Sequence, residues 1–198
     1  MFWQAADGTG HVERLTPDVP SSLMWPESWS PDGRQLVYSQ YNASGDTDLW
    51  VWSAADHRPH TLLQTPASES DARISPDGRW MAYQSDQSGR FDVYVQAFPG
   101  PSRSWPVSPD GGTNPVWSRN GRELFYRNGN MMMAVDVVTT PTFAAGWPKR
   151  LFEGSYLQYY DVARDGRFLM IKDEPEPLTH LILVQNWLEE LKRRVPTP

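Results

Sequence analysis

Residues 29–34 read Trp-Ser-Pro-Asp-Gly-Arg, and an apolar run at 35–39 follows them directly. An Asp-Gly pair between two apolar runs is typical of a tight β-hairpin, because glycine reaches positive φ without steric cost. Pro31 cannot donate a hydrogen bond to a strand ladder, so the first strand should end just before it. The stretch therefore predicts a hairpin that joins a first strand to a second.

The same pattern returns three times along the chain. It reads Ile-Ser-Pro-Asp-Gly-Arg at 74–79, Trp-Ser-Arg-Asn-Gly-Arg at 117–122 and Val-Ala-Arg-Asp-Gly-Arg at 162–167, with glycines at 33, 78, 121 and 166 and spacings of 45, 43 and 45 residues. After each second strand comes another apolar stretch, at 48–52, 92–95, 132–135 and 181–184, and a short fourth element follows in the first three copies at 60–64, 104–107 and 149–152. A period of about 40–45 residues with four strands per unit predicts the blades of a β-propeller.

The predicted fold is therefore all-β. We expect a single domain over residues 1–198, a propeller with four to five four-stranded antiparallel blades, which is either a closed ring or incomplete. The repeats span about 24–66, 69–109, 112–153 and 156–186, a half-blade covers 1–18, and a short C-terminal helix covers 186–194. The ten Trp, eight Tyr and seven Phe fit such a fold, because large aromatic side chains fill the gaps between stacked blades. Ser30, Ser75 and Ser118 recur with the repeat, so we expect them to hydrogen-bond around the turns rather than act as nucleophiles.

The sequence is compatible with two arrangements of the ring of blades. Residues 2–8 and 12–15 align with the third and fourth strands of a blade, and the fourth repeat has no evident fourth strand. An N-terminal strand could complete the last blade and so close the ring. Alternatively the propeller is incomplete, and its unpaired blade edges pair across a homodimer.

Composition excludes several classes of function. The formal charge is −6, and the one cationic cluster is Lys192-Arg193-Arg194, which disfavours a nucleic-acid partner. No apolar run reaches the roughly 18 residues that a membrane span needs. There is no cysteine, hence no disulfide, thiolate nucleophile or Cys-ligated metal. No signal peptide is visible at the N-terminus, so the chain as it stands is expected to be cytoplasmic.

The motif resembles the WD-like propeller repeats of the TolB-like family. Trp/Ile-Ser-Pro-Asp-Gly-Arg, an apolar strand, and then Asp-Leu-Trp-Val at 48–51 or Asp-Val-Tyr-Val at 92–95 carry the resemblance. The stretch 186–192 is similar to the tail of propellers fused behind bacterial serine/threonine kinases, although no kinase motif is present in this chain. The resemblance implies a binding or scaffold module for a protein, peptide or cell-envelope ligand, and relatives that are often periplasmic or extracytoplasmic.

Polar residues that differ between the repeats are the candidate site. Within three residues before Trp29, Ile74, Trp117 and Val162 stand Glu27, Asp71, Asn114 and Asp161. The starts of the innermost strands of a propeller converge at the mouth of its channel, so we expect these side chains to meet there. Glu69 and Arg73 flank the same region and are further binding candidates. The four offsets from the anchor residue differ, however, and alternate offsets point to opposite faces of a strand.

Two functions follow from this candidate site. The first is binding of a protein, peptide or small-molecule ligand at the propeller face. The second rests on the preference of calcium for carboxylate and amide oxygens, with Glu27, Asp71, Asn114 and Asp161 as predicted ligands. Calcium-dependent propeller hydrolases build their sites in this way, so the alternative is a small metal-dependent lactonase or esterase that acts at the channel mouth.

Overall fold

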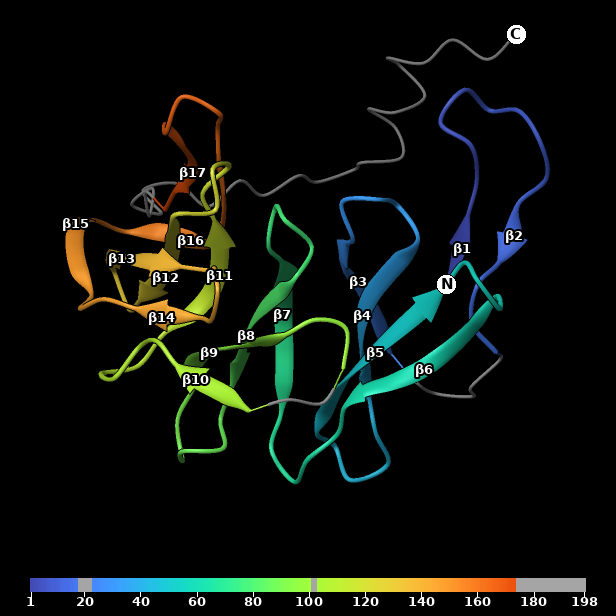
Figure 1. The fold of residues 1–198 in the computed structure, drawn as a ribbon, viewed down its shortest axis with the longest axis horizontal. Coiled ribbons are helices and arrows are strands. Elements are labelled where there is room, and N and C mark those ends of the chain that lie inside the picture. Colours follow the sequence, from blue (N-terminus) through green and yellow to red (C-terminus); the bar gives the residue numbers. More distant parts are fainter. Residues whose placement is uncertain (18–22, 101–102, 174–198) are drawn as a thin grey trace, which may run out of the picture.

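The computed structural model describes residues 1–17, 23–100 and 103–173, and all of its regular elements are strands (Figure 1). Three blades are complete. The first contains β3 (Met24–Trp29), β4 (Gln35–Tyr41), β5 (Thr47–Ser53) and β6 (Arg58–Leu63), and the second contains β7 (Glu69–Ile74), β8 (Trp80–Ser85), β9 (Asp92–Ala97) and β10 (Ser104–Pro106). The third contains β11 (Thr113–Trp117), β12 (Glu123–Asn128), β13 (Met131–Val138) and β15 (Lys149–Glu153), with the short β14 (Ala144–Ala145) also paired to β13. All pairs are antiparallel, so the predicted four-stranded antiparallel blades are confirmed.

The repeated turns have the conformation that the sequence predicts. Gly33, Gly78, Gly121 and Gly166 have φ values of 69°, 72°, 68° and 83°. In the first three turns the serine hydroxyl donates to the side chain two residues on and accepts a backbone N–H, as in Ser75 Oγ to Asp77 Oδ1 at 2.6 Å and Trp80 N to Ser75 Oγ at 3.0 Å. The equivalent bonds exist at Ser30 and Ser118. These serines are structural, as expected.

Each hydrophobic core lies between two neighbouring blades. One cluster joins blades one and two, with Leu49 and Met81 both 0% exposed, and another joins blades two and three, with Val95 and Leu124 both 0% exposed. Trp80 packs in this second cluster against Trp105 and Phe143, with ring centroids 5.5 and 5.3 Å apart. Every blade therefore depends on the blades beside it for burial of its apolar faces.

Two partial blades lie at opposite ends of the arc (Figure 1). β1 (Phe2–Trp3) pairs with β2 (Glu13–Arg14), and Leu15 packs on blade one beside Leu36 and Trp52. At the other end β16 (Tyr156–Val162) pairs with β17 (Phe168–Lys172) and packs on blade three. Among the described strands the N-terminal pair thus stands in the place of a preceding blade and does not complete the last one. Between the described strands, the predicted closure by the N-terminal strand is therefore not formed.

Some predictions fall on residues outside the described ranges. These are the third strand of the fourth repeat at 181–184, the helix at 186–194 and the basic cluster at 192–194. Within the part of the chain that the structure describes, no helix is long and apolar enough to cross a membrane.

Candidate functional site

The candidate residues lie at irregularities in the innermost strands. Glu27 falls at the register shift of β3 between Pro26 and Ser28, Asp71 at that of β7 between Ser70 and Arg73, and Asn114 at that of β11 between Thr113 and Val116. A β-bulge inserts an extra residue and changes the side to which the next side chains point. The unequal offsets in the sequence therefore do not prevent these residues from reaching one region.

Asp71 and Asn114 have left-handed backbones, with φ values of 51° and 52°. Such a conformation is uncommon for residues other than glycine, although Asn and Asp tolerate it best, and it is found repeatedly at functional sites. Because this conformation occurs at equivalent positions of two neighbouring blades, the bulge is a recurring structural feature of the innermost strands.

Hydrogen bonds between the blades hold the bulges in place. The backbone N–H of Asp71 donates to Glu27 Oε1 at 3.3 Å, and the backbone N–H of Asn114 donates to Gln84 Oε1 at 3.0 Å. The hydroxyl of Tyr160 donates to the backbone carbonyl of Asn114 at 2.9 Å. Each bulge is thus tied to an adjacent blade, so the relative position of the blades fixes the geometry of the site.

Glu27 is the most enclosed carboxyl of this group. Ser39 Oγ donates to its Oε1 at 2.7 Å, and Arg73 Nη1 lies 3.5 Å from its Oε2. Its side chain is 8% exposed, whereas that of Arg73 is 36% exposed. Burial raises the pKa of Glu27 to about 7, against the lowering effect of the Ser39 hydrogen bond, and the charge of Asp71 raises it further.

Asp71 has the freer carboxylate. Among the described residues no donor is within hydrogen-bonding distance of its side-chain oxygens, although the nearby charge of Arg73 lowers its pKa. Burial outweighs that charge, so the pKa of Asp71 is raised above its ordinary range. A half-buried carboxylate without a donor is suited to an incoming ligand that supplies one.

A cavity of about 310 Å³ opens at this point. It is lined by Glu27, Asp71 and Arg73 together with three exposed aromatic side chains, Trp25, Tyr41 and Tyr159. Trp25 and Tyr41 meet edge to face, with ring centroids 5.5 Å apart. A small adjoining cavity of about 20 Å³ shares Asp71, Arg73 and Tyr159 and continues to Asn114.

The sequence did not single out the aromatic rim of this cavity. Trp25 and Tyr159 lie outside the repeated motif, and they differ from the residues at corresponding places in the other repeats. That difference between copies is the signal that could have found them, but only the folded chain shows that the rings surround one hollow.

Two predicted residues are not brought to this cavity. Glu69 is 0% exposed and lies between blades one and two, where Thr65 Oγ donates to its Oε1 at 2.5 Å. Asp161 is exposed, and its Oδ1 accepts the backbone N–H of Val162 at 2.8 Å. The cavity therefore gathers Glu27, Asp71 and Arg73, with Asn114 at its extension.

The described residues do not fit a calcium site. They contain no group of three or more His, Cys, Asp or Glu side chains that could hold a metal ion. The Oε1 atom of Glu27 already accepts two hydrogen bonds, and a guanidinium lies beside its Oε2. Calcium needs six to eight oxygen ligands and is repelled by a neighbouring cation.

Comparison with known proteins identifies the family. The model of the TolB beta propeller domain matches residues 15–187, which is most of the chain. The chain belongs to the TolB β-propeller family. The similarity predicted from the Ser-Pro-Asp-Gly repeats is thereby confirmed.

Individual relatives are more distant. "Uncharacterized peptidase YuxL" of Bacillus subtilis (strain 168) is 28% identical over 103 residues, which cover 48% of this chain and 16% of that protein. TolB from Acinetobacter baumannii matches with a TM-score of 0.61 at 18% identity, over 81% of this chain and 39% of that one. A putative 6-phosphogluconolactonase from Bacteroides uniformis ATCC 8492 matches with a TM-score of 0.53 at 15% identity, over 85% and 56%. The chain thus spans only part of the length of each, and the two structural matches show the fold alone.

Proposed function

We propose that this TolB-family propeller is a binding module that holds a protein or peptide segment at the cavity between blades one and two. The observation that carries this proposal is the 310 Å³ cavity itself, in which three exposed aromatic rings surround the carboxylates of Glu27 and Asp71. Propellers are rigid scaffolds, and their binding residues lie where the strands and loops open to solvent.

The lining indicates which side chain of a peptide would enter. Glu27, Asp71 and Arg73 together carry one net negative charge when both carboxyls are ionised, and the donors already present are directed to Glu27 rather than to Asp71. Aromatic faces attract cations and pack against aliphatic chains. A lysine or arginine side chain of the ligand therefore suits the cavity, with its stem against Trp25 or Tyr41 and its charge at Asp71.

The proposal is tested with a phage-displayed library of random peptides panned against the immobilised protein. We expect selected peptides to be enriched in Lys or Arg next to an apolar residue, and to bind as synthetic peptides in calorimetry. Asp71→Asn should weaken that binding about tenfold, because a charged hydrogen bond is lost. Asp136→Asn is the matched control, since Asp136 lies on β13 outside the cavity and pairs with Lys149.

Two results would contradict the binding proposal. One is the absence of any selected peptide with measurable affinity. The other is equal affinity for Asp71→Asn and the unaltered protein, which would place the binding surface elsewhere.

The alternative function, a lactonase or esterase, is favoured by one observation. The pKa of Glu27, about 7, lies where a general base works best, and this carboxyl lines a cavity. Hydrolysis of lactone and ester substrates, measured with and without a chelator and in Asp71→Ala and Asn114→Ala, separates the two functions. Hydrolysis that is lost in these variants would support the enzyme function. If the unaltered protein hydrolyses none of the substrates, the binding function is supported instead.

We also propose that the chain forms a homodimer through its unpaired blade edges.

A further inference from the structure

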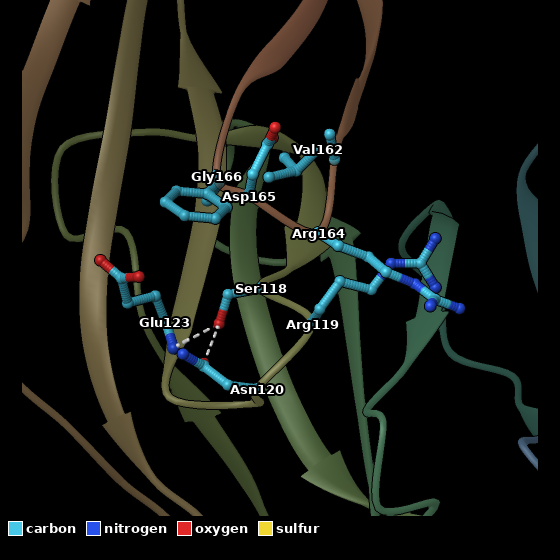
Figure 2. Close-up of a pocket in the computed structure, with 10 residues that line it drawn as sticks. Ser118, Arg119, Asn120, Glu123, Val162, Arg164, Asp165 and Gly166 are labelled. Atoms are coloured by element: carbon cyan, nitrogen blue, oxygen red, sulfur yellow. Dashed lines mark hydrogen bonds between the residues drawn. The ribbon is translucent and has the colours of Figure 1, made fainter.

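A second hollow lies at the opposite end of the innermost strands, between the repeated turns of blades three and four. Its volume is about 620 Å³, and it is lined by residues 118–120 of one turn and 162–166 of the next, with Glu123 and Phe125 (Figure 2). Phe125 and Val162 are buried beneath it, and Arg119 and Arg164 are exposed at its edge.

The turns of the preceding blades are in direct contact with one another. A Cβ atom built on Gly78 would lie 3.4 Å from Cδ of Pro31, and one built on Gly121 would lie 3.8 Å from Cδ of Pro76. The proline of each turn thus packs against the glycine of the next. A Cβ atom built on Gly166 would have no other atom within 4 Å.

The replacement of proline by arginine accompanies this difference. The position of Pro31 and Pro76 in the motif is taken by Arg119 in blade three and by Arg164 in blade four. The hollow is therefore open where the repeat departs from its own pattern, and the departing residues are both cations.

Neither arginine is paired within the described part of the chain. Among the described residues neither guanidinium has a carboxylate within 4 Å or a hydrogen-bond acceptor, whereas Arg167 Nε pairs with Asp165 Oδ2 at 2.8 Å. The other carboxylate of the hollow, that of Glu123, interacts electrostatically with Lys149. Figure 2 shows Arg119 and Arg164 projecting to the same side, away from the carboxylate of Glu123.

Two like charges at the edge of one hollow favour an anion between them. Arginine matches carboxylates by paired, charge-assisted hydrogen bonds, and such bonds are stronger than those between neutral groups. The carboxylates of Asp165 and Glu123 on the same walls disfavour a doubly charged phosphate more than a singly charged carboxylate. The position of the hollow between exposed turns suits a segment of a protein chain rather than an enclosed small molecule.

We propose that Arg119 and Arg164 form a binding site for an acidic protein segment, with the side-chain carboxylates of Asp or Glu as the recognised groups. This site is independent of the cavity at Asp71, because the two lie at opposite ends of the innermost strands. Its recognition groups are two exposed cations, whereas the cavity at Asp71 carries a net negative charge, so the two sites select different ligands.

A labelled hexaglutamate peptide is the probe, and its fluorescence anisotropy is measured with the full chain at low ionic strength. We expect saturable binding that weakens about tenfold for Arg119→Ala and again for Arg164→Ala. Arg119→Pro restores the residue of the first two turns and should have the same effect as Arg119→Ala. Arg34→Ala is the matched control, because Arg34 is an exposed turn arginine of blade one that does not line the hollow.

Charge reversal separates recognition from misfolding. The double variant Arg119→Glu, Arg164→Glu should lose hexaglutamate and bind hexalysine instead, a change that an unfolded chain would not show selectively. A phosphoserine peptide of equal net charge is the second arm, and tighter binding of that peptide would overturn the assignment to carboxylates. Equal binding by the unaltered protein and the double alanine variant, or an equal loss in Arg34→Ala, would overturn the site itself.

Discussion

At the scale of single residues, position in the fold gives similar side chains different properties. Glu27 and Glu69 stand in the innermost strands of two neighbouring blades, and burial raises the pKa of each to about 7. Glu27 lines a cavity, whereas Glu69 is enclosed by Thr65 and Ser85 and by the charges of Asp48 and Asp86. Its Oε2 is buried without a hydrogen-bond partner in the described structure. Glu27 is therefore suited to a binding or catalytic site, whereas the buried carboxyl of Glu69 lowers the stability of the folded state at neutral pH.

The raised pKa of Glu69 predicts how stability changes with pH. The native carboxyl holds its proton up to about pH 7, while the unfolded one releases it near its ordinary value of 4.5. Between these values the native state binds more protons, so the contribution of Glu69 to stability is complete below 4.5 and is lost as pH rises through 7. In the unaltered protein the unfolding free energy should therefore fall between about pH 5 and about pH 8. We expect this fall to be smaller by roughly 2 kcal/mol in Glu69→Gln.

Urea unfolding at a series of pH values measures this effect. Gln keeps an acceptor for Thr65 Oγ but cannot ionise, so the variant isolates the charge. Glu153→Gln is the control, since its side chain is 58% exposed. A pH profile for Glu69→Gln that runs parallel to that of the unaltered protein would refute the raised pKa.

At the scale of the element, the repeated turn is the unit that the sequence describes best. Glycine at positive φ, a preceding serine and an Asp or Asn between them build the same hydrogen bonds in blades one to three. In blade four Ala163 takes the place of serine, so the hydroxyl bonds are missing there, while Asp165 Oδ1 still accepts the backbone N–H of Arg167 at 3.2 Å. The turn chemistry is local, because its partners lie within five residues of one another, and this is why it could be predicted.

Removal of a turn serine should destabilise the protein. Ser75 is 1% exposed, and Ser75→Ala removes an acceptor from the backbone N–H of Trp80 and one of the donors to Asp77, which keeps its bonds from Arg79. We expect the unfolding free energy to fall by about 1–2 kcal/mol. Chemical denaturation of Ser75→Ala beside Ser44→Ala, a change at an exposed loop position, measures it, and equal stability of the two variants would contradict the structural role.

At the scale of the whole molecule, the blades form an arc whose cores lie between neighbours. β17 pairs only with β16 among the described strands, and Leu169 and Ile171 on it are 74% and 58% exposed. Exposed apolar strand edges favour pairing with another chain. We therefore expect a homodimer in sedimentation equilibrium, and expect Leu169→Lys with Ile171→Lys to dissociate it. Val138→Lys is the control, because Val138 is exposed but lies on β13, which is paired with strands on both sides, and a monomer at all concentrations would contradict the proposal.

The candidate site was only partly accessible from the sequence. Comparison of the repeats predicts Glu27, Asp71 and Asn114, because these residues differ between otherwise similar copies, and Arg73 flanks them in the sequence. It could not show that bulges in the innermost strands redirect the side chains, nor that Glu69 is enclosed. Bulges depend on pairing between strands and burial depends on the adjacent blade, and neither is encoded within one short motif.

The sequence by itself determined the blade, its four strands, its turn and its period. These follow from contacts between residues close together in the chain, which glycine, proline and apolar alternation specify. Only the tertiary structure decided that the described strands form an open arc, that aromatic rings surround Asp71, and that Arg119 and Arg164 line one hollow without a partner among residues 1–17, 23–100 and 103–173. Each of these depends on how one blade is placed against the next, a relation between residues about 45 positions apart that interblade packing fixes.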